Sequence, residues 1–158
     1  MQEVNSIGAE YYCRRLEVFL RERHPRLVHA IGLIDGRSRA AAAVYREAIA
    51  SGEDAFRAAT RADALLYEGL IFSKFDTIGC LLALDYPVLP EERRRSLALE
   101  MEESLADVFN RYNLDDGIYA REEYRHLLAE LSEAVCRYLD GVRLPILRRG
   151  RPPHHKQL

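Results

Sequence analysis

The sequence predicts an all-α protein, a single-domain bundle of five to six helices with a basic C-terminal tail. Three observations predict this class. Apolar residues recur at intervals of three and four, no stretch alternates apolar and polar residues as a half-buried strand does, and Pro or Gly stands at the ends of the periodic segments. The length suits one domain, expected over residues 1–141, followed by the tail at 142–158.

Three helices are expected in the first half of the chain. The first covers about 7–23 and ends at His24-Pro25, because proline disfavours helical backbone in the residue before it. The second occupies much of 30–50 and closes at Ser51-Gly52, and the third starts at Asp54 with a weak point at Gly69. Apolar residues at helical spacing are expected to face inward, and these are Tyr12, Leu16, Phe19, Leu20, Ile34, Ala41, Val44, Tyr45, Ala48, Ile49, Phe56, Ala59, Ala62, Leu66 and Leu70.

Three more helices are expected in the second half. The fourth, 74–86, is apolar on nearly every side and should be central. The fifth runs from Pro90 to about Tyr112, and the sixth from about Arg121 to Leu139, after a turn at 113–117. Their inward residues are expected to be Phe75, Ile78, Leu81, Leu82, Leu84, Tyr86, Leu97, Met101, Leu105, Val108, Phe109, Tyr112, Tyr124, Leu127, Leu128, Leu131, Val135 and Tyr138.

Composition indicates an ordinary globular protein and predicts no membrane span. An apolar fraction of 48% and a charged fraction of 30% are ordinary for a globular chain. No run of about 18 apolar residues predicts a membrane span, and the first residues lack the regions of a signal peptide, so a cytoplasmic location is expected. Cys13, Cys80 and Cys136 are far apart, without ligands at metal-binding spacing, and are expected to be buried free thiols.

Polar residues interrupt the most apolar run of the chain, 65–79, and form its candidate site. The simplest interpretation is structural: Ser73 is the N-cap of the fourth helix and Asp76 stands at its third position. Alternatively, Glu68, Ser73, Lys74 and Asp76 contact a ligand or partner, because backbone N–H groups at a helix start, together with a lysine, can hold an anion. No residue is assigned a catalytic role, and no cofactor is expected.

Two further polar features are weaker signals. Glu123-x-x-His126 has the spacing of a dimetal element, but a bundle site needs paired copies, so no metal is expected. Beyond residue 141, five basic residues occur with no acid. Arg148, Arg149 and Arg151 suit contact with nucleic acid phosphates, although the sequence favours the simpler interpretation of a disordered, solubilising tail.

Several short motifs carry a family resemblance. They are Tyr11-Tyr12, His24-Pro25, Leu66-Tyr67-Glu68-Gly69-Leu70, Phe72-Ser73-Lys74 and Asp76-Thr77. Together they resemble a bacterial domain-of-unknown-function family of small all-helical proteins, found mainly in Bacteroidetes and often near mobile-element genes. The resemblance implies a multihelical fold and an accessory role around such elements, and it supplies no catalytic residues. The turn at 114–117 departs from the family pattern.

The function expected from these observations is that of a non-enzymatic helical protein-interaction or accessory protein, whose partner is a protein. One alternative is a nucleic-acid-associated accessory protein that uses the basic tail. A second is a small enzyme or ligand-binding protein with a site near Glu68, Lys74 and Asp76. The sequence identifies neither the partner nor the oligomeric state.

Overall fold

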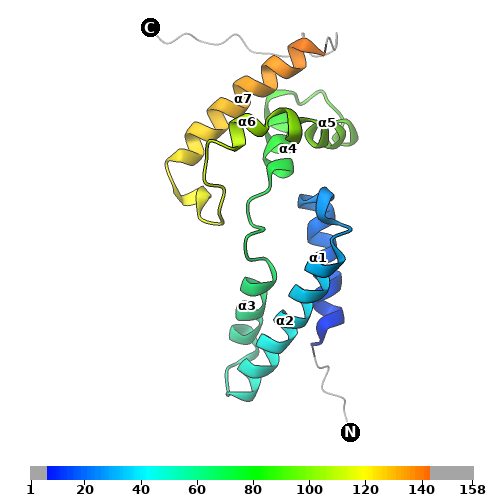
Figure 1. Cartoon of the computed structure of the whole chain (residues 1–158), viewed down its shortest axis with the longest axis vertical. Helices are drawn as coiled ribbons and strands as arrows, with labels where there is room; N and C mark the ends of the chain where they lie inside the picture. The colour runs from blue at the N-terminus through cyan, green and yellow to red at the C-terminus, as the bar shows by residue number, and fades with distance from the viewer. Residues whose placement is uncertain (1–6, 143–158) are drawn as a thin grey trace. The chain divides into compact units, whose positions relative to one another are not determined.

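A computed structural model describes residues 7–142 of the chain (Figure 1). These residues form helices and connecting turns with no strand among them, so the predicted all-α class is confirmed. The chain divides into two compact units, the first ending at Ile71 and the second beginning at Phe72, and the single domain expected over 1–141 stays a prediction. Each unit has its own hydrophobic core. The predicted tail, 143–158, lies outside the described residues.

The first unit is built from α1 (Ala9–Arg23), α2 (Ile31–Ala50) and α3 (Ala55–Leu66), with a short 3-10 helix, η1 (Pro25–Leu27), after α1. As predicted, α1 ends at His24, whose φ of −135° and ψ of 64° lie outside the helical region. Helix α2 contacts both α1 and α3. It is therefore the central helix of this unit.

Small side chains bring α2 and α3 together. Ala41, Ala42 and Ala48 on α2 and Ala58 and Ala62 on α3 are all buried, so the two backbones can approach closely. The larger buried side chains of the first unit include Tyr12, Leu16, Leu20, Ile34, Leu66 and Leu70. Burying each leucine or isoleucine among them contributes roughly 1.5–3 kcal/mol relative to leaving it exposed. The core of the unit thus extends past the end of α3, to Leu70.

The second unit contains α4 (Lys74–Asp85), α5 (Glu91–Ser104), α6 (Ala106–Phe109) and α7 (Glu123–Gly141), with a 3-10 helix, η2 (Ile118–Ala120), before α7. Helix α4 contacts both α5 and α7, in agreement with its predicted central place. The core of this unit includes Phe72, Phe75, Ile78, Leu82, Leu97, Met101, Phe109, Ile118, Leu127, Leu131 and Val135. Ile118 is fully buried, although helical spacing predicts no core residue between Tyr112 and Tyr124.

The predicted fifth helix is two helices in the structure. Leu105 separates α5 from α6, because its φ of −99° and ψ of 9° leave the helical region. Leu105 itself remains 4% exposed, and Val108 and Phe109 beyond it are also buried. The break therefore redirects the chain while these three predicted core residues stay inside.

Some side chains predicted to face inward are exposed instead. Ile49, Phe56 and Leu84 are 42%, 81% and 77% exposed. Each lies within two residues of a helix end, where a neighbouring helix covers less of the surface than it does at mid-helix. The three cysteines are free, as predicted, but Cys80 is exposed and the other two are half-buried.

A helix that spans a bilayer needs about 20 mostly apolar residues in succession. None of the helices between residues 7 and 142 is long and apolar enough to cross a membrane.

We expect Gly36→Ala to stabilise the first unit and Gly69→Ala to destabilise it. Gly36 lies inside α2 with open space where a Cβ atom would lie, so Ala should add about 0.5–1 kcal/mol by restricting the unfolded chain. Gly69 has a φ of 74°, and Ala there should cost roughly 1–2 kcal/mol. Chemical denaturation of the full chain measures both changes, and equal shifts for the two variants would contradict this assignment.

Candidate functional site

The residues that the sequence marks as a candidate site are divided between the two units. Glu68 follows α3 in the first unit, whereas Ser73, Lys74 and Asp76 begin the second. Ser73 is fully buried, and its hydroxyl accepts a hydrogen bond from the Asp76 backbone N–H at 2.9 Å. Its carbonyl accepts one from the Thr77 hydroxyl at 2.7 Å. The predicted N-cap is confirmed, and it fixes the start of α4.

The charged members of this set have different surroundings. Lys74 is exposed, with its Nζ 5.5 Å from the centroid of the Phe109 ring, a distance suited to a cation–π contact. Asp76 is half-buried in the first turn of α4, where the helix dipole stabilises a negative charge. The Glu68 side chain is exposed. A role of these residues in binding a ligand or partner stays a prediction.

Two side chains outside the predicted site hold the segment after α3. The last four carbonyls of a helix have no intrahelical partner. Arg37 Nη1 on α2 donates to the carbonyl oxygens of Leu65 at 3.0 Å and Glu68 at 2.6 Å, with a longer contact of 3.4 Å to Leu66. His24 Nε2 donates to the Leu70 carbonyl at 2.7 Å. These bonds attach the segment to α2 and to the end of α1.

A second cross-helix contact joins α1 and α3. Arg15 Nη1 and Nη2 bond the two carboxylate oxygens of Asp63 at 2.6 and 3.0 Å. The Arg15 guanidinium also lies 5.4 Å from the Tyr11 ring centroid and 5.9 Å from that of Tyr67. Burial, with the negative charge of Asp63, raises the pKa of Tyr12 to about 12, so this phenol remains protonated at neutral pH. The cluster stabilises the packing of α1 and α3.

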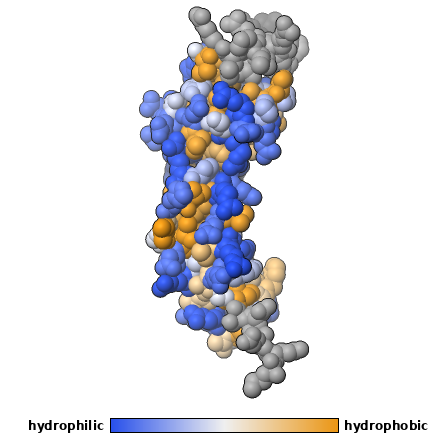
Figure 2. Space-filling view, turned by 90° about the vertical axis from the view of Figure 1, so that its right-hand side faces the viewer, coloured by the Kyte–Doolittle hydropathy of each residue, from blue (hydrophilic) through white to orange (hydrophobic). Residues whose placement is uncertain are grey.

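An open groove of about 360 Å³ lies between α1 and α2. Its apolar lining includes Val28, Ile31 and Ile34, of which Ile31 is 77% exposed and Ile34 is buried. Hydrophobic side chains reach the surface among hydrophilic ones on the face shown in Figure 2. The groove also carries carboxylates, those of Glu10, Glu17 and Asp35. We name this feature the α1/α2 groove.

Cys13 and Glu17 both line the α1/α2 groove. They form a hydrogen bond in which a neutral thiol donates to a charged carboxylate. The Cys13 Sγ lies 3.7 Å from Glu17 Oε1, as a weak hydrogen bond. Desolvation, and then the nearby Glu17 charge, raise the pKa of the Cys13 thiol. The thiol therefore stays protonated and is a poor nucleophile. The sequence could not show this groove, because its walls come from two separate helices and the turn between them.

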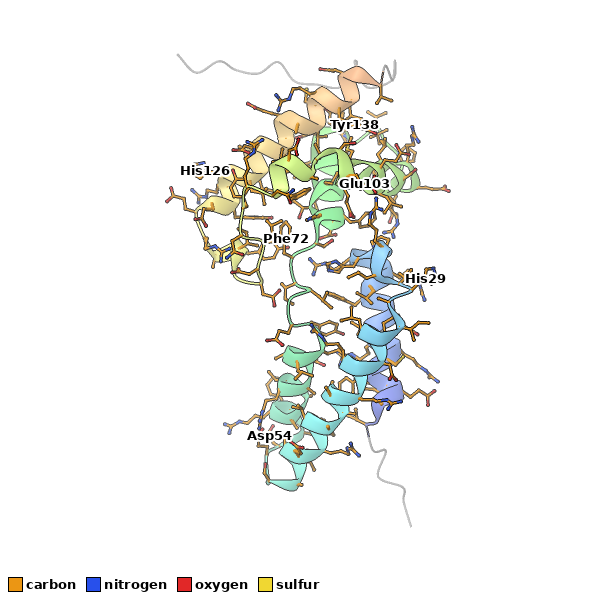
Figure 3. The ribbon with its side chains drawn as sticks, viewed as in Figure 1. His29, Asp54, Phe72, Glu103, His126 and Tyr138 are labelled. Atoms are coloured by element: carbon orange, nitrogen blue, oxygen red, sulfur yellow. The ribbon has the colours of Figure 1, made fainter. Side chains whose placement is uncertain are left out.

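In the second unit, Arg121 organises the turn before α7. Its Nη1 lies 2.7 Å from Asp115 Oδ1 and its Nε 3.1 Å from Glu123 Oε2. The hydrogen bond from Arg121 lowers the pKa of Asp115, assisted by the Gly117 N–H. Glu123 of the Glu123-x-x-His126 pair is thus in an ion pair, and His126 is exposed on α7 (Figure 3). Within residues 7–142, no three or more His, Cys, Asp or Glu side chains gather in a way that could hold a metal ion.

Acidic charge is concentrated in the second unit. Residues 72–142 contain fifteen acidic and eight basic side chains, whereas residues 7–71 contain nine acidic and ten basic. The basic residues Arg148, Arg149 and Arg151 fall outside the part of the chain that the structure describes. Their predicted contact with nucleic acid therefore stays a prediction.

Comparisons with known proteins identify a family and a related structure. The model of the family described as Domain of unknown function (DUF1896) matches residues 5–144. The crystal structure of protein PG0816 from Porphyromonas gingivalis is similar to this chain at 30% sequence identity, with a TM-score of 0.80 over 87% of this chain and 95% of that one. No curated protein matches this chain.

We expect Arg37→Gln to destabilise the protein and Arg39→Gln to have little effect. Loss of the Arg37 bonds leaves carbonyls after α3 without their donor, at a cost of about 1–3 kcal/mol. Arg39 is a matched control on the same helix, where among residues 7–142 it makes an exposed ion pair with Asp35 worth about 0–1 kcal/mol. Urea denaturation of both variants measures the difference. A loss for Arg37→Gln no larger than that for the control would contradict the role given to it.

We expect Arg121→Gln to raise the pKa of Asp115 toward its ordinary value. Because Arg121 lowers that pKa in the folded state, its stabilising effect is present above the unfolded pKa of the carboxyl and is lost as the pH falls. An NMR titration of the Asp115 carboxyl carbon in wild-type and variant protein measures the change. An unchanged titration curve would mean that Arg121 does not set this pKa.

Proposed function

This chain belongs to the DUF1896 family, and we propose that it is a non-enzymatic accessory protein that binds another protein through the α1/α2 groove. The observation that carries this proposal is the exposed apolar surface of the groove, centred on Ile31. Contiguous apolar surface bordered by charged residues is typical of interaction sites. Covering it removes apolar area from water at about 25 cal/mol per Å².

The polar residues of the family motifs support the same proposal over an enzyme site near Glu68. Ser73 caps α4, and Arg37 and His24 occupy the carbonyls on both sides of Gly69. These contacts give a structural role to the side chains of Ser73 and His24 and to the backbone around Gly69. In contrast, most of the Ile31 surface is left uncovered by residues 7–142, which is why an interaction is favoured there.

The family resemblance extends the proposal to cellular context. We infer a cytoplasmic accessory role around mobile genetic elements, with a protein as the binding partner. The chemistry of the α1/α2 groove is consistent with a partner that brings both apolar and basic side chains, since apolar lining and carboxylates occur there together.

We expect Ile31→Ser to abolish partner capture, while Phe56→Ser and Glu68→Gln preserve it. Phe56 is a matched control, since it is 81% exposed in the same unit and does not line the groove. The full-length proteins would be used as bait in a native extract, with captured proteins quantified by mass spectrometry.

Two outcomes would oppose this function. Equal capture by Ile31→Ser and the wild type would remove the groove from it. Loss of capture in Glu68→Gln alone would favour the alternative site near Glu68. Separately, a nucleic acid shift assay would support the tail alternative if affinity fell steeply with salt.

A further inference from the structure

The α1/α2 groove combines apolar side chains and carboxylates on one small surface. Its apolar lining consists of Ala9, Val28, Ile31 and Ile34. Three carboxylates accompany them: Glu10 pairs with Arg14, Asp35 pairs with Arg39, and Glu17 accepts from the Cys13 thiol. The Glu17 carboxylate thus receives its hydrogen bond from an uncharged donor. The groove therefore suits an occupant that has apolar side chains beside positive ones.

One segment of this protein has that chemistry. Residues 143–151 read Arg-Leu-Pro-Ile-Leu-Arg-Arg-Gly-Arg. Leu144, Ile146 and Leu147 supply three large apolar side chains within four residues, and four arginines flank them with no acid nearby. Such a segment is a candidate ligand for an apolar, carboxylate-lined groove.

We propose that the α1/α2 groove binds the segment Arg143–Arg151 of a second copy of this chain. Leu144, Ile146 and Leu147 contact Ile31 and its apolar neighbours, and the arginines pair with Glu17 and Asp35. This proposal rests on the proposed function and names its partner. The groove lies entirely within the first unit, so a second copy can present the segment whatever the placement of the two units in one chain.

Charge alone would direct the segment elsewhere. The second unit carries the larger excess of acidic residues, so simple attraction would distribute the arginines over residues 72–142. The groove differs because it adds apolar contact to negative charge. Apolar contact is short-ranged and therefore selects a location, whereas attraction between exposed charges is diffuse and screened by salt. The two cases predict different sites of contact.

Carbodiimide cross-linking of the full chain separates these cases. The reagent joins a lysine amine to a nearby carboxylate, and this sequence has only two lysines, Lys74 and Lys156. The variant Arg149→Lys places a third amine inside the segment while keeping its charge. An equimolar mixture of ¹⁴N and ¹⁵N protein, digested and analysed by mass spectrometry, shows which carboxylate each lysine reaches and from which copy.

We expect peptides of mixed isotope that join residue 149 to Glu17 or Asp35. Ile31→Ser in the same background should reduce their yield about tenfold, the change expected when an apolar anchor is lost. Glu17→Gln should abolish the Glu17 link, while Glu22→Gln, on the exposed side of α1 and outside the groove, should leave all links unchanged. Circular dichroism spectra confirm that each variant folds.

Cross-links spread over the carboxylates of residues 72–142 would overturn the proposal, as would groove cross-links found only within one isotopic species. Equal yields from Ile31→Ser and wild type would also overturn it. If these results occurred while partner capture still depended on Ile31, the groove would remain an interaction site for a different protein. If capture also proved independent of Ile31, the proposed function itself would fail.

Discussion

The first unit depends on how the backbone carbonyls after α3 are satisfied. Helix α3 ends at Leu66, and the chain turns at Gly69, which has a φ of 74°. A helix end packed against neighbouring helices needs donors from outside the helix. Arg37 supplies them to Leu65 and Glu68, and His24 supplies one to Leu70. Without these donors, the turn would expose polar backbone to the apolar groups around Leu66 and Leu70.

The need to satisfy these backbone carbonyls explains why the family motifs between Leu66 and Thr77 lie in the apolar run 65–79. Its first half, Tyr67 to Leu70, is attached to the first unit by Arg37 and His24. Its second half, from Phe72, starts the core of the second unit and caps α4 through Ser73 (Figure 3). The motif therefore encodes the passage of the chain from one unit to the next. Among its polar side chains, Ser73 and Thr77 have hydrogen bonds that fix the start of α4.

Local rules predicted the helices well because their signals lie within a few residues. His24-Pro25 ends α1, Ser73 caps α4, and the spacing of apolar residues identifies most of the buried side chains. The division into two units was not predicted, since it depends on which helices pack together rather than on the pattern of any one helix. For the same reason the sequence could not show that Arg37 reaches Glu68, thirty-one positions away. The α1/α2 groove also required the tertiary structure.

Helix α2 connects this structural constraint to the proposed binding surface. Arg37 and Ile31 are six residues apart, and at about 100° per residue they project roughly 120° from each other around the helix. One face therefore holds the segment after α3, while another lines the groove. Because the two faces are distinct, Ile31 can change without removing a donor from Glu68, and Arg37 can change without altering the groove's apolar lining. Stability and binding can thus be measured separately on a single helix, so a binding defect in Ile31→Ser cannot be attributed to loss of the turn at Gly69.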